Sequence, residues 1–237
     1  DNVVAPDMMR HLVAAFADPR VGIAGPLAVL DSDPQRVGWT GGGWISLWSS
    51  RTRWEGQGVR DTGQFVEPVQ VGHMPNLFML QASMFREVGG IDADYVMHYE
   101  ESDLAEKVKR SGRIVILVPA ARTRHRDIAA PGDGDRQFRG SNPMLLYLAM
   151  RNRLVFMRKN SGGIRLAVFL VAFSPIFLLH GLLMLVRNRR WALIRLSCRG
   201  YMDGVRYALG GRLASLPTCV PPVHGDHCVT DSLLTFF

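Results

Sequence analysis

The sequence lacks several features that define common protein classes. Its 237 residues contain only three cysteines, Cys198, Cys219 and Cys228, which are too few for a disulfide framework and suit a reducing compartment. It has neither the G-x-G-x-x-G pattern of dinucleotide-binding folds nor a Walker phosphate-binding loop. No internal repeat is present. These absences argue against a disulfide-rich secreted domain, a Rossmann enzyme and a P-loop nucleotidase.

Acidic residues are scarce in the second half of the chain. Residues 1–125 carry 13 Lys and Arg against 15 Asp and Glu, whereas residues 126–237 carry 15 against 6. The second half also holds 21 consecutive positions without a charge, residues 166–186. An apolar stretch between basic flanks favours a membrane and its anionic headgroups as partner. Basic residues do not alternate with aromatic ones, so we expect no nucleic-acid partner.

The first 125 residues alternate between helix-like and strand-like segments. Residues 7–16 have helical spacing of apolar positions, and "VGIAGPLAVL" from Val21 reads as a buried strand. "EESDLAEKVKRSG" predicts a helix, with acids in its first turn, bases in its last and Gly112 at its end. "RIVILVPAARTRH" follows as a strand. This alternation predicts an α/β layered fold.

The chain begins at Asp1 without an initiator methionine or a signal peptide. We therefore expect it to start in the middle of a domain.

Several segments together resemble family 2 glycosyltransferases of the GT-A fold, in their rhamnosyltransferase-like bacterial branch. "DNVVAPD" resembles the end of that family's D-x-D metal segment, and "MPNLFMLQASMFREVGGID" resembles its acceptor side. "YEESDLAEKVKRSGRIVILVPAARTRH" resembles its Y-x-E-D-x-D-L block with the following histidine, and "YLAMRNRLVFMRK" resembles the helix after the domain. The resemblance runs from Asp1 to about Gly211 and implies an incomplete GT-A sheet that lacks the first half of the nucleotide-binding domain.

The resemblance implies a metal-dependent inverting glycosyltransferase of hexosyl or rhamnosyl type. It would move a sugar from a nucleotide-diphosphate donor to a hydroxyl of a glycan or lipid-linked acceptor, in bacterial surface-polysaccharide synthesis. The implied location is the cytoplasmic face of the inner membrane, with membrane lipids as partners. Because half of the nucleotide site would be missing, we expect the isolated chain to be inactive.

Glu101 occupies the position of the family's usual catalytic aspartate, so the resemblance implies that it is the general base. The adjacent Glu100 could serve instead, and Asp103 is a third candidate with a supporting or capping role. From the helix pattern alone, all three acids could simply stabilise the helix dipole.

The implied cofactor is a divalent metal, Mg²⁺ or Mn²⁺, since carboxylate oxygen is a hard ligand that both ions accept. Asp1 and His125 match the family's metal positions. The residues expected at the acceptor or donor cleft are Gly42, Gly43, Trp44, Pro75 and Asn76.

The sequence predicts five regions. Residues 1–140 form the C-terminal half of the GT-A domain, 141–163 a basic amphipathic helix, 164–188 an apolar membrane-associated or transmembrane helix, 189–213 a second basic amphipathic helix, and 214–237 a disordered tail. The apolar segment could span the bilayer with a kink at Pro175, form a hairpin, or lie in the interface.

Two other functions are compatible with these patterns. One is a non-catalytic membrane-anchored binding or scaffold protein on a degenerate transferase fold. The other is a processive polysaccharide synthase, which should carry a Q-x-x-R-W motif that is missing between His125 and Arg165.

Overall fold

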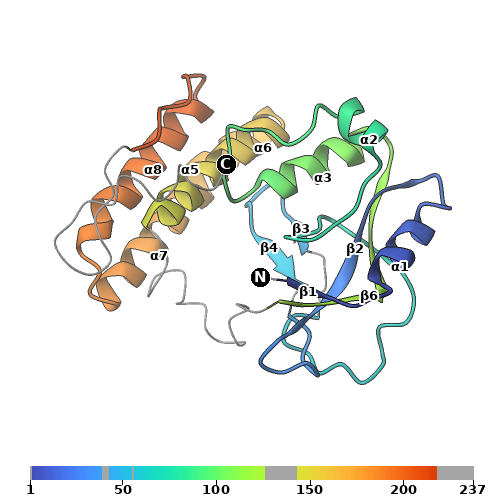
Figure 1. The fold of residues 1–237 in the computed structure, drawn as a ribbon. Coiled ribbons are helices and arrows are strands. Elements are labelled where there is room, and N and C mark those ends of the chain that lie inside the picture. The colour runs from blue at the N-terminus through green and yellow to red at the C-terminus, as the bar shows by residue number, and fades with distance from the viewer. Residues whose placement is uncertain (1, 39–42, 55, 126–142, 218–237) are drawn as a thin grey trace. The chain divides into compact units, whose positions relative to one another are not determined.

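A computed structural model describes residues 2–38, 43–54, 56–125 and 143–217 of the chain (Figure 1). The chain divides into two compact units. The α/β unit contains residues 1–46, 51–92 and 100–133, and the helical unit contains residues 47–50, 93–99 and 134–237. Two short segments from the first hundred residues thus belong with the C-terminal helices.

The α/β unit is built around one long strand, β6 (Ile114–His125). Strand β2 (Val21–Leu30) runs parallel to it along one side. On the other side, β5 (Val69–Val71) pairs antiparallel with the first half of β6, and β1 (Asn2–Val4) pairs antiparallel with its last three residues. The result is a four-stranded mixed sheet with β6 in its interior.

Helices cover both faces of this sheet. Helix α1 (Met8–Ala15) packs on one face, and α3 (Glu100–Arg110) packs on the other, close to the short helix α2 (Ala82–Glu87) (Figure 1). Successive side chains of a strand point to opposite faces. Accordingly, Val115 and Leu117 join the core with α3, while Ile116 and Val118 join the core with α1. The predicted α/β layering is therefore confirmed for this unit.

The pairing of β2 with β6 is interrupted near a proline. Pro26 pairs with Val118, but the next residue, Leu27, pairs with Arg122. The segment 119–121 of β6 has no β2 partner and includes Pro119, whose missing N–H cannot join a ladder. This irregularity precedes the end of β6, where the candidate site lies. A separate two-stranded hairpin is formed by β3 (Gly43–Ile45) and β4 (Thr52–Trp54).

The helical unit contains α5 (Pro143–Asn160), α6 (Gly163–Val168), the π-helical segment η1 (Phe169–Phe173), α7 (Ser174–Arg187) and α8 (Ala192–Ala208). Helices α5 and α8 approach closely because glycines face a backbone. A Cβ on Gly200 would lie 2.5 Å from the carbonyl oxygen of Tyr147, and one on Gly204 would lie 2.8 Å from that of Arg151. A buried hydrogen bond from the Tyr147 hydroxyl to Asp203 Oδ2, 2.9 Å long, also joins the two helices.

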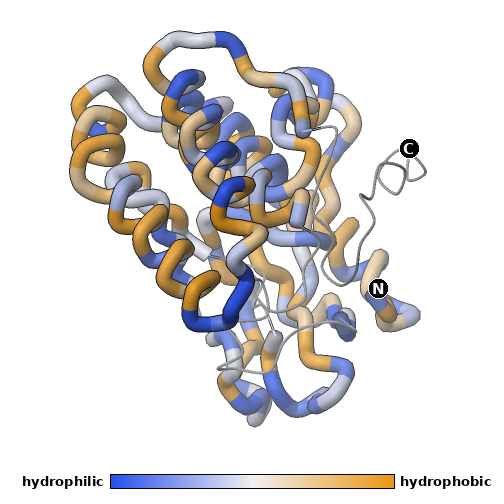
Figure 2. Tube along the Cα trace, turned by 90° about the vertical axis from the view of Figure 1, so that its left-hand side faces the viewer, coloured by the Kyte–Doolittle hydropathy of each residue, from blue (hydrophilic) through white to orange (hydrophobic). Residues whose placement is uncertain are grey.

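Segments α6, η1 and α7 form one continuous helix, Gly163–Arg187, of 25 residues. By length and composition it could cross a membrane. The tube in Figure 2 shows a mostly hydrophobic stretch followed by a hydrophilic turn. The π-helical turn ends just before Ser174 and Pro175, where the missing N–H of proline interrupts α-helical bonding.

Candidate active site

Glu101 lies in the first turn of α3 and is held by a neighbouring loop. Its Oε1 accepts a hydrogen bond from the backbone N–H of Asn76, at 2.6 Å. Asn76 has a φ of 65°, in the left-handed region that asparagine tolerates better than most residues. The turn that presents this N–H therefore fixes one oxygen of Glu101.

The surroundings of Glu101 favour its protonated form. Burial raises the pKa of its carboxyl from 4.5 to about 7; the hydrogen bond from Asn76 opposes this shift, and the nearby charge of Glu100 adds to it. A carboxylate with a pKa near 7 holds a proton more readily than an ordinary glutamate does at neutral pH. Such a group is suited to general base catalysis.

Glu100, the alternative base, has a different environment. Burial raises the pKa of its carboxyl as well. Its Oε2 is buried and has no hydrogen-bond partner in the described part of the chain. Among the described residues, none that lines the hollow at the end of β6 forms a hydrogen bond with the Glu100 side chain. The position of Asn76 therefore links Glu101 to that hollow, and Glu100 has no equivalent link.

Asp103 is placed as a structural residue. It is 1% exposed, and its carboxylate lies 2.9 Å from the Nζ of Lys107, one turn along the helix. The same Nζ donates a hydrogen bond to the carbonyl oxygen of Gly90. The ion pair lies within α3, and the hydrogen bond from Lys107 connects α3 to the segment that follows α2.

A small, shallow hollow lies at the carboxyl end of β6. Its walls include His125 from β6 and the predicted cleft residues Pro75 and Asn76. The remaining wall residues are Asn2, Pro26, Ala28, Leu77 and Thr123. Because Asn76 also bonds to Glu101, the structure brings the predicted base, two cleft residues and the predicted histidine to one region.

His125 is 6% exposed and ends β6 beside Asn2, its antiparallel partner. Asp1, the other predicted metal ligand, lies outside the described residues. Among residues that are described, no group of three or more His, Cys, Asp or Glu side chains could hold a metal ion. His125 is thus the only one of the two predicted ligands whose position can be tested for fit. One nitrogen does not make a protein metal site, so no step below depends on a metal.

The glycine-rich segment predicted at the cleft lies only partly within the described residues. Gly42 falls outside them. Gly43 is buried beside the segment 72–73. A Cβ on Gly43 would lie 3.0 Å from the ring of His73, and a Cβ on Gly72 would lie 2.5 Å from the carbonyl oxygen of Gly43. Trp44 lines a second, wider and more open hollow, together with Ile45, Ser46, Arg51, Thr52 and Arg53. Gly43 and Trp44 are therefore not among the residues of the hollow at β6.

Sequence reasoning missed the polar residues Asn2 and Thr123 in the wall of that hollow. The sequence could have indicated both, because Asn2 follows Asp1 directly and Thr123 lies two residues before His125. His73 does not line that hollow; it is buried, and desolvation lowers its pKa to about 4. A single histidine in an apolar segment gives no signal in the sequence that separates it from a surface histidine.

The loop that leads into α3 is held by a mechanism with no local sequence signal. Val96, His98 and Tyr99 all have positive φ values, between 63° and 75°. The side-chain amide of Asn152, fully buried on α5, donates to the carbonyl oxygens of Tyr95, Met97 and His98 at 2.7, 2.7 and 3.1 Å. The two N–H bonds of one side chain are thus shared among three carbonyls within the helical unit.

No protein-family model and no curated protein matches the chain. Among solved structures, a crystal structure of GalNAc-T7 with UDP, GalNAc and Mn²⁺ is similar to part of it, with a TM-score of 0.42 and 20% sequence identity. The match covers 55% of this chain and 27% of the GalNAc-T7 chain, so it spans about a quarter of that protein. A likeness of this extent does not establish an activity for the chain.

Proposed function

We propose that the chain is part of an inverting glycosyltransferase, with Glu101 as the general base. The observation that carries this proposal is the Glu101–Asn76 hydrogen bond, which joins a carboxylate of raised pKa to the wall of the hollow that also contains His125. The sequence resemblance to family 2 glycosyltransferases of rhamnosyltransferase type supports the proposal, because the same residues carry it.

In this proposal, Glu101 Oε2 takes the proton of an acceptor hydroxyl. The freed oxygen forms a bond to the anomeric carbon of a nucleotide-diphosphate sugar, while the bond from that carbon to the diphosphate oxygen breaks. The diphosphate leaves with the electron pair of that bond, and the anomeric configuration inverts. The raised pKa of Glu101 suits this step, because a stronger carboxylate base accepts the proton more readily.

The hydrogen bond from Asn76 would hold the Glu101 carboxylate in a fixed orientation toward the acceptor. The Asn76 N–H fixes Glu101 Oε1, and a reacting carboxylate that is displaced by ~1 Å can lose ~100-fold in rate. Glutamate is one methylene longer than the aspartate usual in the family. The bond to Asn76 would compensate by restraining the longer side chain.

The divalent metal that the resemblance implies, Mg²⁺ or Mn²⁺, is a proposed cofactor that would supply positive charge at the diphosphate, and the proton transfer to Glu101 does not depend on it. His125 would be one ligand, and Asp1 is the second proposed one. The acceptor would be a glycan or a lipid-linked glycan of a bacterial surface polysaccharide, at the cytoplasmic face of the inner membrane. The basic helical unit supports a membrane location, since cationic residues are attracted to anionic lipid.

The experiment that tests the proposal is a donor screen with the full-length polypeptide encoded by the gene. UDP-, dTDP- and GDP-sugars are offered with Mn²⁺ and a membrane extract that supplies acceptors, and release of the nucleoside diphosphate is measured together with sugar incorporation into lipid extract. We expect one donor class to give both products in equal amounts. Tight donor binding without transfer of any sugar would instead identify a non-catalytic binding protein.

A further inference from the structure

The helix Gly163–Arg187 has two faces of different character. Its inner positions are buried, namely Leu166, Phe169, Ser174, Gly181 and Leu185. Its outer positions are large, apolar and exposed, and we call them the outer face: Ile164, Val171, Ile176, Leu179, Leu183 and Val186, with exposed fractions between 40% and 81%. Within each face, successive residues are three, four or seven positions apart in the sequence, as in an α-helix, except for one spacing of five.

The π-helical segment keeps both faces in register. The five-residue steps run from Phe169 to Ser174 and from Val171 to Ile176, and both include part of η1 (Phe169–Phe173). A π-helical turn takes up more residues than the 3.6 of an α-helix. The extra residue therefore preserves one continuous apolar stripe on the outside and one continuous packing stripe on the inside.

The inner side is occupied by α5 and α8. Ser174 Oγ and the Tyr201 hydroxyl are 2.9 Å apart, which joins α7 to α8. The guanidinium of Arg153, on α5, lies 3.9 Å from the centre of the Phe177 ring. A Cβ on Gly181 would meet the Met150 side chain of α5 at 2.5 Å.

These contacts decide how the helix could meet a bilayer. Its length permits a span, since 25 residues extend ~37 Å at 1.5 Å each. However, Arg153 contacts it near the middle, so a spanning arrangement with this packing would carry a guanidinium to the bilayer centre. Charges there are costly and rare. The buried Tyr147–Asp203 pair between α5 and α8 would be carried into the hydrocarbon as well.

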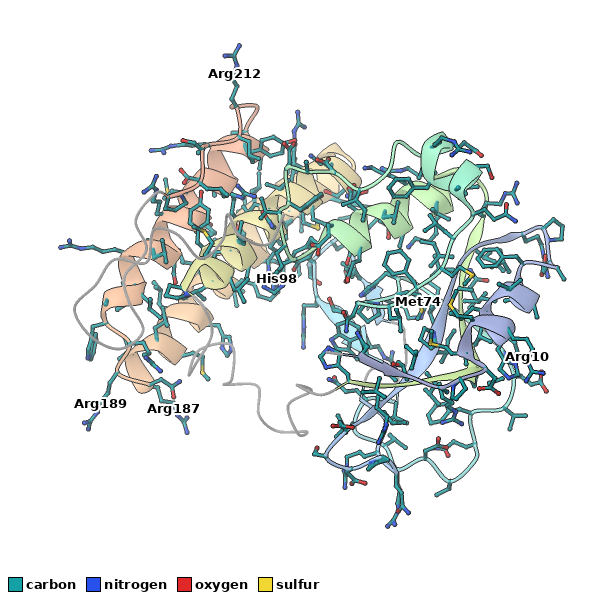
Figure 3. All side chains as sticks on the ribbon, in the orientation of Figure 1. Arg10, Met74, His98, Arg187, Arg189 and Arg212 are labelled. Atoms are coloured by element: carbon teal, nitrogen blue, oxygen red, sulfur yellow. The ribbon has the colours of Figure 1, made fainter. Side chains whose placement is uncertain are left out.

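The charges at the two ends of the helix fit a surface arrangement. No charged residue lies between Leu166 and Val186, and Arg165 precedes that stretch. At the other end, Arg187 and Arg189 point away from the helices (Figure 3). Trp191, 60% exposed, follows them. Arginine and tryptophan are the residues that favour the headgroup level.

We propose that the helix Gly163–Arg187 lies along the surface of an anionic bilayer, with its outer face inserted at the boundary between headgroups and acyl chains. Arg165, Arg187 and Arg189 bind lipid phosphates at its two ends. The partner is a lipid surface, and the helix does not cross it. This inference depends on no step of the proposed sugar transfer, so it can fail or hold independently of that reaction.

The first test uses vesicle flotation of the full chain with phosphatidylcholine alone and with added anionic phosphatidylglycerol. We expect binding to the anionic vesicles. Val171→Glu should weaken that binding by about tenfold or more, because it places a charge on the inserted face. Val66→Glu is the matched control, since it makes the same change at an exposed valine of the α/β unit, and it should bind like the unchanged protein.

The second test measures how deeply positions of the helix insert into the bilayer. With the three native cysteines changed to serine, a fluorophore is attached to a single cysteine at Ile164, Ile176 or Val186. Nitroxide lipids labelled near the headgroup should quench all three positions equally and best. If the label at Ile176 instead lies deepest in the bilayer while those at Ile164 and Val186 lie near the headgroups, the helix spans the bilayer and the proposal is overturned. Absence of vesicle binding, with Val171→Glu converting a dimer to a monomer, would overturn it in favour of self-association.

Discussion

Glu101 and Asn76 are 25 residues apart in the sequence, yet Glu101 Oε1 lies 2.6 Å from the backbone nitrogen of Asn76. This contact joins the start of α3 to the turn that lines the hollow at the end of β6. The carboxylate is thereby placed as a partly buried acid beside the wall of this hollow. The predictions below test this placement and the packing of the helical unit.

Replacing Glu101 by glutamine should stabilise the α/β unit at high pH. The pKa of Glu101 is raised to about 7 in the fold, so the folded state holds the proton more tightly than the unfolded one does. The stability of the unchanged protein should consequently fall as pH rises from about 4.5 to about 7. Glutamine keeps an oxygen for the Asn76 N–H but does not ionise.

The expected gain for Glu101→Gln is on the order of 1–2 kcal/mol above pH 7, allowing for partial solvent screening, and close to zero below pH 4.5. Urea unfolding at a series of pH values measures it. A constant difference between the two proteins at all pH values would show that Glu101 does not titrate as described.

Asn152→Asp should destabilise the helical unit. Aspartate has nearly the same shape but cannot donate the three hydrogen bonds to the carbonyls of Tyr95, Met97 and His98. It also brings a charge toward three buried oxygens. We expect a loss of roughly 3 kcal/mol or more in the free energy of unfolding.

Asn160→Asp is the control for Asn152→Asp, because Asn160 lies on the same helix and its side-chain amide donates to the carbonyl oxygen of Phe156, in the preceding turn of that helix. It should cost less than about 1 kcal/mol in urea unfolding. Equal effects of the two substitutions would mean that Asn152 does not hold the loop 94–98.

Gly200→Ala should loosen α8 from α5. The added methyl would lie 2.5 Å from the carbonyl oxygen of Tyr147, a backbone atom that cannot move without shifting the helix. A loss of about 2–3 kcal/mol is expected from this overpacking. Gly163→Ala, where a Cβ meets no atom within 4 Å, should be neutral or slightly stabilising. Thermal unfolding of both variants decides between close and loose packing of α5 on α8.

The parts of the structure that could be predicted from sequence are those with local signals. Helix α3 runs from Glu100 to Arg110, as its acidic start and basic end predict, and β2 is buried at every position, as its unbroken apolar run predicts. These signals depend on residues within one or two turns of each other.

The parts that could not be predicted depend on contacts between distant residues. Val96, His98 and Tyr99 adopt positive φ values that side chains of their kind normally avoid. They do so in a loop whose carbonyls bond to Asn152, more than fifty positions away. The Glu101–Asn76 bond is similar, since nothing near Glu101 in the sequence indicates which N–H it meets. The sequence left the choice between Glu100 and Glu101 open, because glutamate stands where the family pattern has aspartate.

The most direct test of the central claim compares Glu101→Gln with Glu100→Gln in the full-length protein, once the donor screen has identified a substrate. The proposed role of Glu101 predicts that Glu101→Gln lowers kcat by a factor of ~10²–10⁴, the range expected for loss of a general base, while donor affinity and Glu100→Gln turnover stay near normal. Near-normal turnover of Glu101→Gln, together with loss of turnover in Glu100→Gln, would contradict the account.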